Sequence, residues 1–81
     1  MARDIYEKFF VFLMTAPDNE LKIDGCVIKR NNIGYSVIKV YDDEGIFCIE
    51  AINLNNGMLE TMHLYDIPQE DLEKIFKHVK K

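Results

Sequence analysis

The chain has 81 residues, a formal net charge of −4 and two cysteines; 48% of its residues are hydrophobic and 30% are charged. This length and composition predict one folded domain over residues 1–81, and they disfavour disorder or a second core. The acidic balance disfavours broad affinity for phosphate backbones or anionic membranes. The longest apolar run, Phe9 to Met14, is too short for a membrane span or a signal peptide, so we expect a cytoplasmic protein.

The first segment, residues 2–16, is predicted to be a helix that ends before Pro17, because the residue before a proline avoids the helical region. Apolar residues recur every three or four positions and predict one buried stripe. That stripe comprises Ile5, Phe9 and Phe12, flanked by Tyr6, Leu13 and Ala16. Three further apolar residues fall outside it: Phe10, Val11 and Met14. This surplus indicates contact with the sheet edge or with a second chain.

Residues 18–25 are predicted to be a polar connection, with Leu21 and Ile23 leaning on the core. A strand over residues 26–30 follows, and Cys26 and Cys48 fall on strands separated by another strand, about 9–10 Å apart. That separation is too large for a disulfide, and free thiols suit a reducing compartment.

The turn at residues 31–34 has four residues with glycine last, where a left-handed conformation is needed. This loop would place Val27 opposite Ile38 and Ile28 opposite Val37. A three-residue loop with a glycine bulge is the alternative, and it would bury Cys26 and Ile28 instead.

Residues 35–65 predict three strands joined by two turns. Asn56-Gly57 suits a two-residue type I′ turn, which places Ile49 opposite Leu64 and Glu50 opposite His63. A four-residue loop at 42–45 places Val40 opposite Phe47 and Ile38 opposite Ile49. At the 42–45 turn, a three-residue loop with a glycine bulge is the alternative, and it would shift the pairing of this hairpin by one residue. The two preferred registers agree on one apolar face, which comprises Ile38, Val40, Phe47, Ile49, Ala51, Met62 and Leu64.

Residues 67–79 predict a second helix, with Pro68 at its first position and acidic residues at the positive end of its dipole. Its apolar stripe comprises Leu72, Ile75, Phe76 and Val79. The predicted fold is therefore α+β: a four-stranded antiparallel meander with a helix at each end, in the order α-β-β-β-β-α.

The opposite face of this sheet mixes tyrosines, aliphatic residues and a few charges, which is typical of binding surfaces. Tyrosine and valine are also tolerated on exposed strands, so a solvated face is the competing interpretation. The predicted interaction surface comprises Tyr35, Val37, Lys39, Tyr41, Ile52 and Tyr65 from the sheet, with Phe10 and Met14 from the first helix. We expect a non-enzymatic protein–protein interaction module that binds a protein partner and forms a homodimer.

No phosphate-binding loop, paired-cysteine zinc motif or nucleophile motif occurs, so we expect no catalytic residue, cofactor or metal. Cys48, Glu50 and His63 are the best chemical grouping on the open face and could form a thiol nucleophile or a zinc site. Cross-strand Glu–His pairs, however, commonly stabilise sheets. The alternative function is a nucleic-acid accessory protein that uses a patch of Lys29, Arg30, Lys39 and Tyr35. Nearby acidic residues disfavour that patch, and no small-molecule ligand is inferred.

Overall fold

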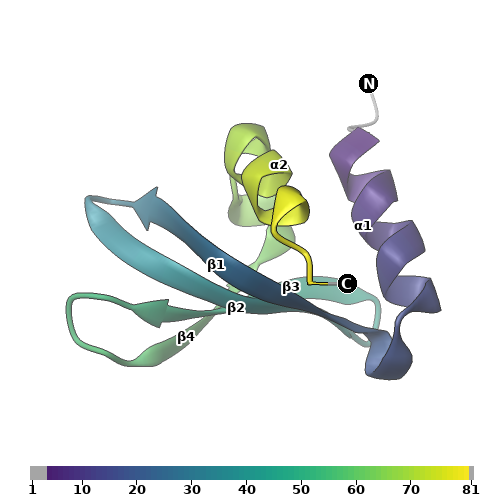
Figure 1. Ribbon diagram of the computed structural model, residues 1–81, viewed down its shortest axis with the longest axis horizontal. Helices are drawn as coiled ribbons and strands as arrows, with labels where there is room; N and C mark the ends of the chain where they lie inside the picture. The colour runs from purple at the N-terminus through teal and green to yellow at the C-terminus, as the bar shows by residue number, and fades with distance from the viewer. Residues whose placement is uncertain (1–3, 81) are drawn as a thin grey trace.

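Two helices and a four-stranded antiparallel sheet make up the fold, which confirms the predicted α+β class and element order (Figure 1). The computed structural model describes residues 4–80. Its elements are α1 (Asp4–Thr15), the 3-10 turn η1 (Pro17–Asn19), β1 (Glu20–Arg30), β2 (Ile33–Asp43), β3 (Ile46–Asn53), β4 (Leu59–His63), the 3-10 turn η2 (Leu64–Asp66) and α2 (Gln69–Lys77). The strands lie in chain order across the sheet, as a meander requires.

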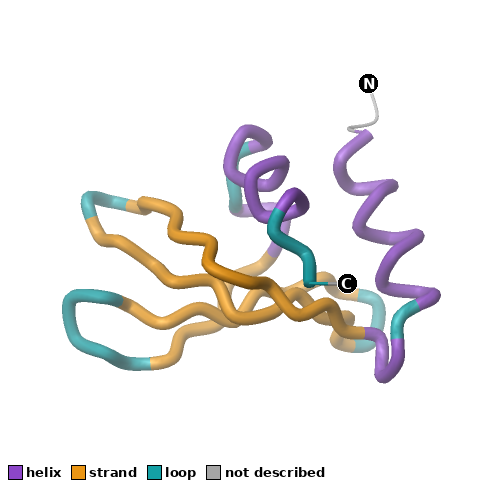
Figure 2. Tube along the Cα trace, in the orientation of Figure 1, coloured by secondary structure: helices purple, strands orange, loops and turns teal. Residues whose placement is uncertain are grey.

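Both helices lie on one side of the sheet, and the core fills the space between the two layers (Figure 2). The face of the sheet that the helices cover is called the core face below, and the other is called the outer face. The most deeply buried side chains are Phe9, Leu13, Val40, Ile49, Leu64, Ile67, Leu72 and Ile75. No described segment crosses the outer face (Figure 1), so that face is open.

α1 packs on the sheet through residues spaced by four: Ile5, Phe9 and Leu13. Phe12, expected in the buried stripe, is 40% exposed and instead contacts the ring of Phe76 edge-on, with ring centroids 4.8 Å apart. Leu13 takes the core position because the helix presents every fourth residue to the sheet. The first residues of the predicted helix, Ala2 and Arg3, lie outside the described residues.

The predicted connection at residues 18–25 is largely strand, since β1 begins at Glu20. Leu21 and Ile23 are buried, as expected. The strand is interrupted between Lys22 and Cys26, where Gly25 adopts a φ of +70°. An irregularity of this kind bends a strand and increases its local twist.

The β1–β2 turn has two residues, Asn31 and Asn32, both with positive φ, so the predicted four-residue loop is wrong. Two consecutive left-handed residues define a type I′ turn, and asparagine tolerates that conformation. Ile28 therefore lies opposite Tyr35. Cys26 and Ile28 are buried, as the alternative register expected, but through a different turn.

The β2–β3 turn also has two residues, Glu44 and Gly45, with φ of 51° and 91°. Val40 consequently lies opposite Ile49, two residues from the predicted partner Phe47. Because side chains alternate with a period of two, a shift of two leaves all three residues on the core face.

A bulge between Val37 and Lys39 reverses the alternation of β2. Ile38 is the extra residue and is 37% exposed, although the predicted pairing buried it opposite Ile49. Before the bulge, Tyr35 and Val37 face the core, with 8% and 2% of their surface exposed. Both residues were predicted for the interaction surface, and both belong instead to the core.

The β3–β4 loop is longer than the predicted two-residue turn: it spans residues 54–58, and Ile52 lies opposite Leu59. The buried side chain of Asn53 explains the change. Its Oδ1 accepts the backbone N–H of Asn55 at 2.8 Å and of Asn56 at 3.3 Å. An asparagine that caps a turn in this way stabilises a wider loop than the Asn-Gly pair alone would choose.

α2 is shorter than predicted, and Pro68 is its N-cap, with extended backbone, instead of its first helical residue. The carbonyl of Pro68 accepts the N–H groups of Asp71 and Leu72, each at 3.0 Å. After the helix, Val79 forms an isolated bridge with Ile23 of β1. Among residues 4–80, neither helix is long and apolar enough to cross a membrane.

Candidate functional site

The predicted interaction surface is divided among three places in the structure. Tyr35 and Val37 lie in the core. A second group lies on the outer face of the sheet: Lys39, Tyr41 and Ile52. A third group comes together from distant elements around one hollow: Phe10, Met14 and Tyr65.

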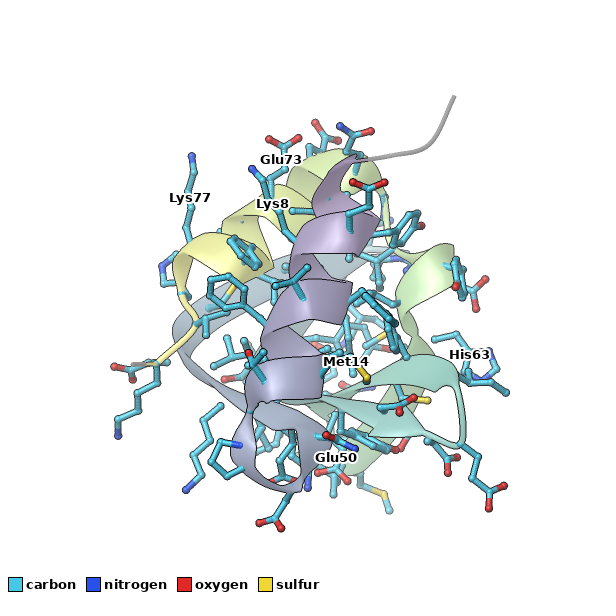
Figure 3. All side chains as sticks on the ribbon, turned by 90° about the vertical axis from the view of Figure 1, so that its right-hand side faces the viewer. Lys8, Met14, Glu50, His63, Glu73 and Lys77 are labelled. Atoms are coloured by element: carbon cyan, nitrogen blue, oxygen red, sulfur yellow. The ribbon has the colours of Figure 1, made fainter. Side chains whose placement is uncertain are left out.

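That hollow lies between α1, the β2–β3 turn and η2, and it encloses about 480 Å³. It is called the aromatic groove here, and its apolar lining comprises Tyr6, Phe10, Met14, Phe47 and Tyr65. Figure 3 shows α1 from outside, with Met14 on the flank of the helix beside the β2–β3 hairpin. The groove therefore joins the surplus apolar side of α1 to the sheet.

Ring contacts define the two ends of the aromatic groove. Tyr6 and Tyr65 have centroids 5.0 Å apart, and Phe10 and Phe47 have centroids 6.1 Å apart. These separations are typical of favourable aromatic pairs. Phe10 and Tyr65 nevertheless stay 53% and 62% exposed, so both rings keep surface for a partner.

The rim of the aromatic groove is acidic. Glu7 and Asp42 line it, and Asp43 and Glu44 continue the same turn. Neither lysine nor arginine is among the described residues that line it. The nearest basic residue along α1, Lys8, lies instead over the ring of Phe76, 5.9 Å from its centroid. The groove thus combines an apolar floor with a negative edge.

The outer face of the sheet carries a row of cross-strand neighbours that runs through all four strands. The row comprises Val27, Ser36, Ile52 and Leu59. Val27 and Leu59 are 45% and 56% exposed. The row is apolar at three of its four positions, and it includes Val27, which the predicted four-residue turn had placed opposite Ile38 of the core face.

Lys39 occupies the polar part of the outer face. Its Nζ donates to Glu20 Oε2 at 3.2 Å, lies 3.9 Å from Glu50 Oε1, and sits 5.3 Å from the ring centroid of Tyr41. The hydrogen bond to Glu20 is the main cause that raises the pKa of Lys39. Two carboxylates from neighbouring strands therefore neutralise this lysine, and it offers little free charge to a ligand.

The expected grouping of Cys48, Glu50 and His63 is only partly formed. Cys48 lies opposite His63, whereas Glu50 lies opposite Thr61, so the predicted Glu–His pair is wrong. The Cys48 side chain is buried, and burial followed by the charge of Asp43 raises the pKa of its thiol. A nucleophilic cysteine needs a lowered pKa, so this environment favours the inert thiol. Within residues 4–80, no cluster of three potential metal ligands occurs.

The alternative nucleic-acid patch is dispersed in the same way. Tyr35 is buried, Lys39 is paired, and Arg30 lines a hollow at the β4 edge with Met62 and Asp66. Only Lys29 extends freely from the outer side of β1. Stacking platforms for single strands need exposed aromatic residues beside unpaired cations, and these residues do not provide that arrangement.

Two lining residues of the aromatic groove, Tyr6 and Phe47, were expected in or beside the core. The useful signal in the sequence was the surplus of apolar residues on α1, which predicted an extra contact surface but not its second wall. No family model, curated protein or solved structure matches this chain.

Proposed function

We propose that this chain is a non-enzymatic protein–protein interaction domain that binds its partner through the aromatic groove. The observation that carries the proposal is the convergence of Phe10, Met14 and Tyr65, from two distant elements, around one apolar hollow. Interface centres are enriched in aromatic residues and methionine, and tyrosine combines a large ring with a hydroxyl that can stay hydrated.

The charge around the aromatic groove indicates the kind of partner. Glu7 and Asp42 on the rim favour cations, and the apolar floor favours an aliphatic or aromatic side chain. We therefore infer a partner segment that carries an apolar anchor flanked by lysine or arginine. Complementary charge of this kind mainly raises the association rate and excludes acidic competitors.

Matched substitutions on α1 test this function. Phe10 lines the groove, whereas Val11 is 56% exposed on the same helix and does not line it. Phe10→Ser should remove a specific set of proteins captured from the native host, and Val11→Ser should retain that set. The captured set should also be released by salt, because opposite charges are screened.

The melting temperatures of both variants should stay close to that of the wild type, because the two side chains are already half-exposed. Capture that is the same for Phe10→Ser, Val11→Ser and the wild type would contradict the assignment of the groove. Captured proteins whose binding region is acidic would contradict the charge argument.

A further inference from the structure

The two edges of the sheet differ in whether another segment covers them. At the β1 edge, the N–H of Asp24 donates to the carbonyl of His78 at 2.9 Å, and the N–H of Lys80 donates to that of Lys22 at 2.7 Å. The Nζ of Lys74 also donates to the carbonyl of Val27 at 2.7 Å. Exposed strand edges are templates for pairing with other chains, and proteins commonly cover them. The C-terminal segment performs that covering for β1.

The β4 edge has no such cover in the described part of the chain, where β4 pairs with β3 alone. The N–H of Asn53 donates to the carbonyl of Met58 at 2.8 Å, and this bond fixes which residues of β4 direct their backbone groups toward β3. In an antiparallel ladder the bonded positions alternate, so the N–H and C=O groups of Leu59 and Thr61 point away from β3. β4 contains neither a proline nor a bulge that would block pairing.

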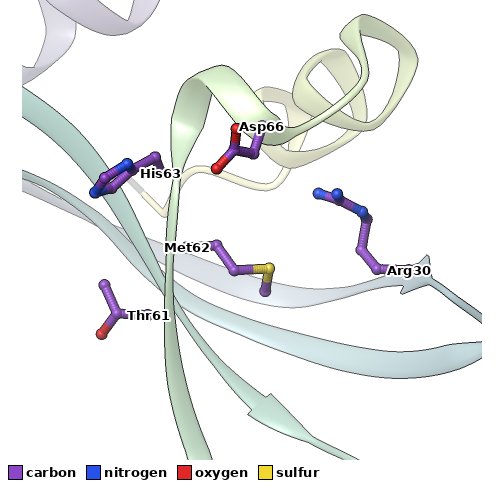
Figure 4. A pocket seen from close by; sticks show the side chains of 5 residues that line it. All are labelled: Arg30, Thr61, Met62, His63 and Asp66. Carbon is purple, nitrogen blue, oxygen red and sulfur yellow. The ribbon is translucent and has the colours of Figure 1, made fainter.

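A hollow of about 390 Å³ runs along this edge (Figure 4). It is lined by Arg30, Thr61, Met62, His63 and Asp66. Thr61 and His63 point to one side of β4 and Met62 to the other (Figure 4). One hollow can touch both sides of a strand only where it passes the free edge.

The hollow also contains a hydrogen-bond donor without an acceptor. Nη1 of Arg30 is buried and has no partner among the described residues. Most buried polar atoms are paired, and an unmade bond to a charged donor is costly. An acceptor supplied from outside this copy of the chain would satisfy it.

We propose that β4 pairs with β4 of a second copy around a twofold axis at Thr61, which joins two sheets into one of eight strands. Thr61 is the middle residue of β4, and its backbone groups point outward, so it can form a bonded pair with its own copy. Leu59 then lies opposite His63 of the second copy, and Glu60 opposite Met62. No like charges face each other, and Thr–Thr pairs stabilise antiparallel strands.

This self-complementarity favours a second copy over an unrelated peptide. An axis at Glu60 would set two carboxylates against each other, and the backbone groups of Glu60 already bond β3 by the same alternation. With the axis at Thr61, Glu60 of the second copy lies on the core face next to Met62 and Arg30. Its carboxylate oxygens already accept from Asn53 and Tyr35, and each has a second lone pair for the Nη1 of Arg30.

Cysteine cross-linking tests the position of the axis, because only a residue on the axis meets its own copy. Thr61→Cys should form a disulfide-linked dimer under mild oxidation much faster than Leu59→Cys or His63→Cys alone. A mixture of the Leu59→Cys and His63→Cys proteins should form the mixed dimer. The native Cys26 and Cys48 are buried, and Cys48, which lies opposite His63, is replaced by alanine in every variant so that it cannot pair with the new cysteine within one chain. Equal cross-linking rates for Thr61→Cys and Leu59→Cys would overturn the proposal.

Sedimentation of variants without new cysteines tests the pairing itself. The wild type and Thr61→Val should dimerise with increasing concentration. Thr61→Lys should remain monomeric, because two lysines would meet on the axis. Its melting temperature should equal that of the wild type at a concentration where the wild type is also monomeric. A wild type that stays monomeric at high micromolar concentration, or a dimer that persists in Thr61→Lys, would overturn the proposal. Phe10→Ser should still dimerise, which separates this edge from the aromatic groove.

Discussion

The side chain of Asn53 holds the β3–β4 loop, and replacing it with alanine should destabilise the domain strongly. Asn53 is 5% exposed, and its Nδ2 donates to Glu60 Oε2 at 2.9 Å. Its Oδ1 accepts the N–H groups of Asn55 and Asn56. Asn53→Ala removes all three bonds and leaves the Glu60 carboxylate with one fewer donor in a part-buried site.

The magnitude follows from the kinds of bond that are lost. The bond to a carboxylate contributes about 1.5–3 kcal/mol, and each neutral bond about 0.5–1.5 kcal/mol. Water can replace the partner of the two loop N–H groups, because Asn55 and Asn56 are exposed, so their contribution falls at the lower end. We therefore expect Asn53→Ala to cost about 2–4 kcal/mol, a large share of the roughly 4–12 kcal/mol typical of a domain of this size.

Urea unfolding followed by circular dichroism measures this loss, and Asn56→Ala is the matched control. Asn56 lies in the same loop, is exposed, and accepts only the N–H of Met58 with its Oδ1, at 2.9 Å. Its replacement should cost about 1 kcal/mol or less. Equal losses for the two variants would refute the idea that Asn53 sets the width of this loop.

Two further predictions concern the two faces of the sheet and its buried tyrosine. Ile49→Ala should cost about 2–5 kcal/mol because this residue is fully buried, whereas Ile52→Ala on the open face should cost much less, and equal losses in urea unfolding would contradict an open outer face. Burial and then the charge of Glu60 raise the pKa of Tyr35 above its usual value of 10.0. The corresponding stability is fully present below that value and is lost as the pH rises through the folded pKa, since the unfolded chain ionises first. Melting temperatures between about pH 9 and about pH 11 should therefore fall less steeply for Tyr35→Phe than for the wild type.

The strands and their core face were predictable because hydrophobic alternation survives errors of two residues. The predicted pairing of Val40 with Phe47 was displaced by two positions, yet both residues lie on the core face with Ile49. Only a displacement by an odd number of residues would exchange the faces. The bulge at Ile38 is such a displacement, and it moved Tyr35 and Val37 from the predicted surface into the core.

The turns were less predictable because their geometry depends on residues outside them. Glu44 adopts a φ of 51°, which few non-glycine residues do, so local preference did not identify a two-residue turn there. The favourable Asn56-Gly57 pair did not form one either, because Asn53 bonds the loop from within β3. The width of the β3–β4 loop is therefore decided by a side chain that lies outside the turn sequence.

The same reasoning explains how much of the candidate site could be predicted. Phe10 and Met14 were recognisable as surplus because they fall outside the core stripe of their own helix, which is a local property. Their neighbours in the aromatic groove, Phe47 and Tyr65, depend on how the β2–β3 turn and η2 sit beside α1. A shift of that turn by two residues leaves Phe47 on the core face but changes how far it lies from the end of the hairpin. The face of a residue was thus settled by alternation, whereas its distance from a second element was settled only by the turn that joins them.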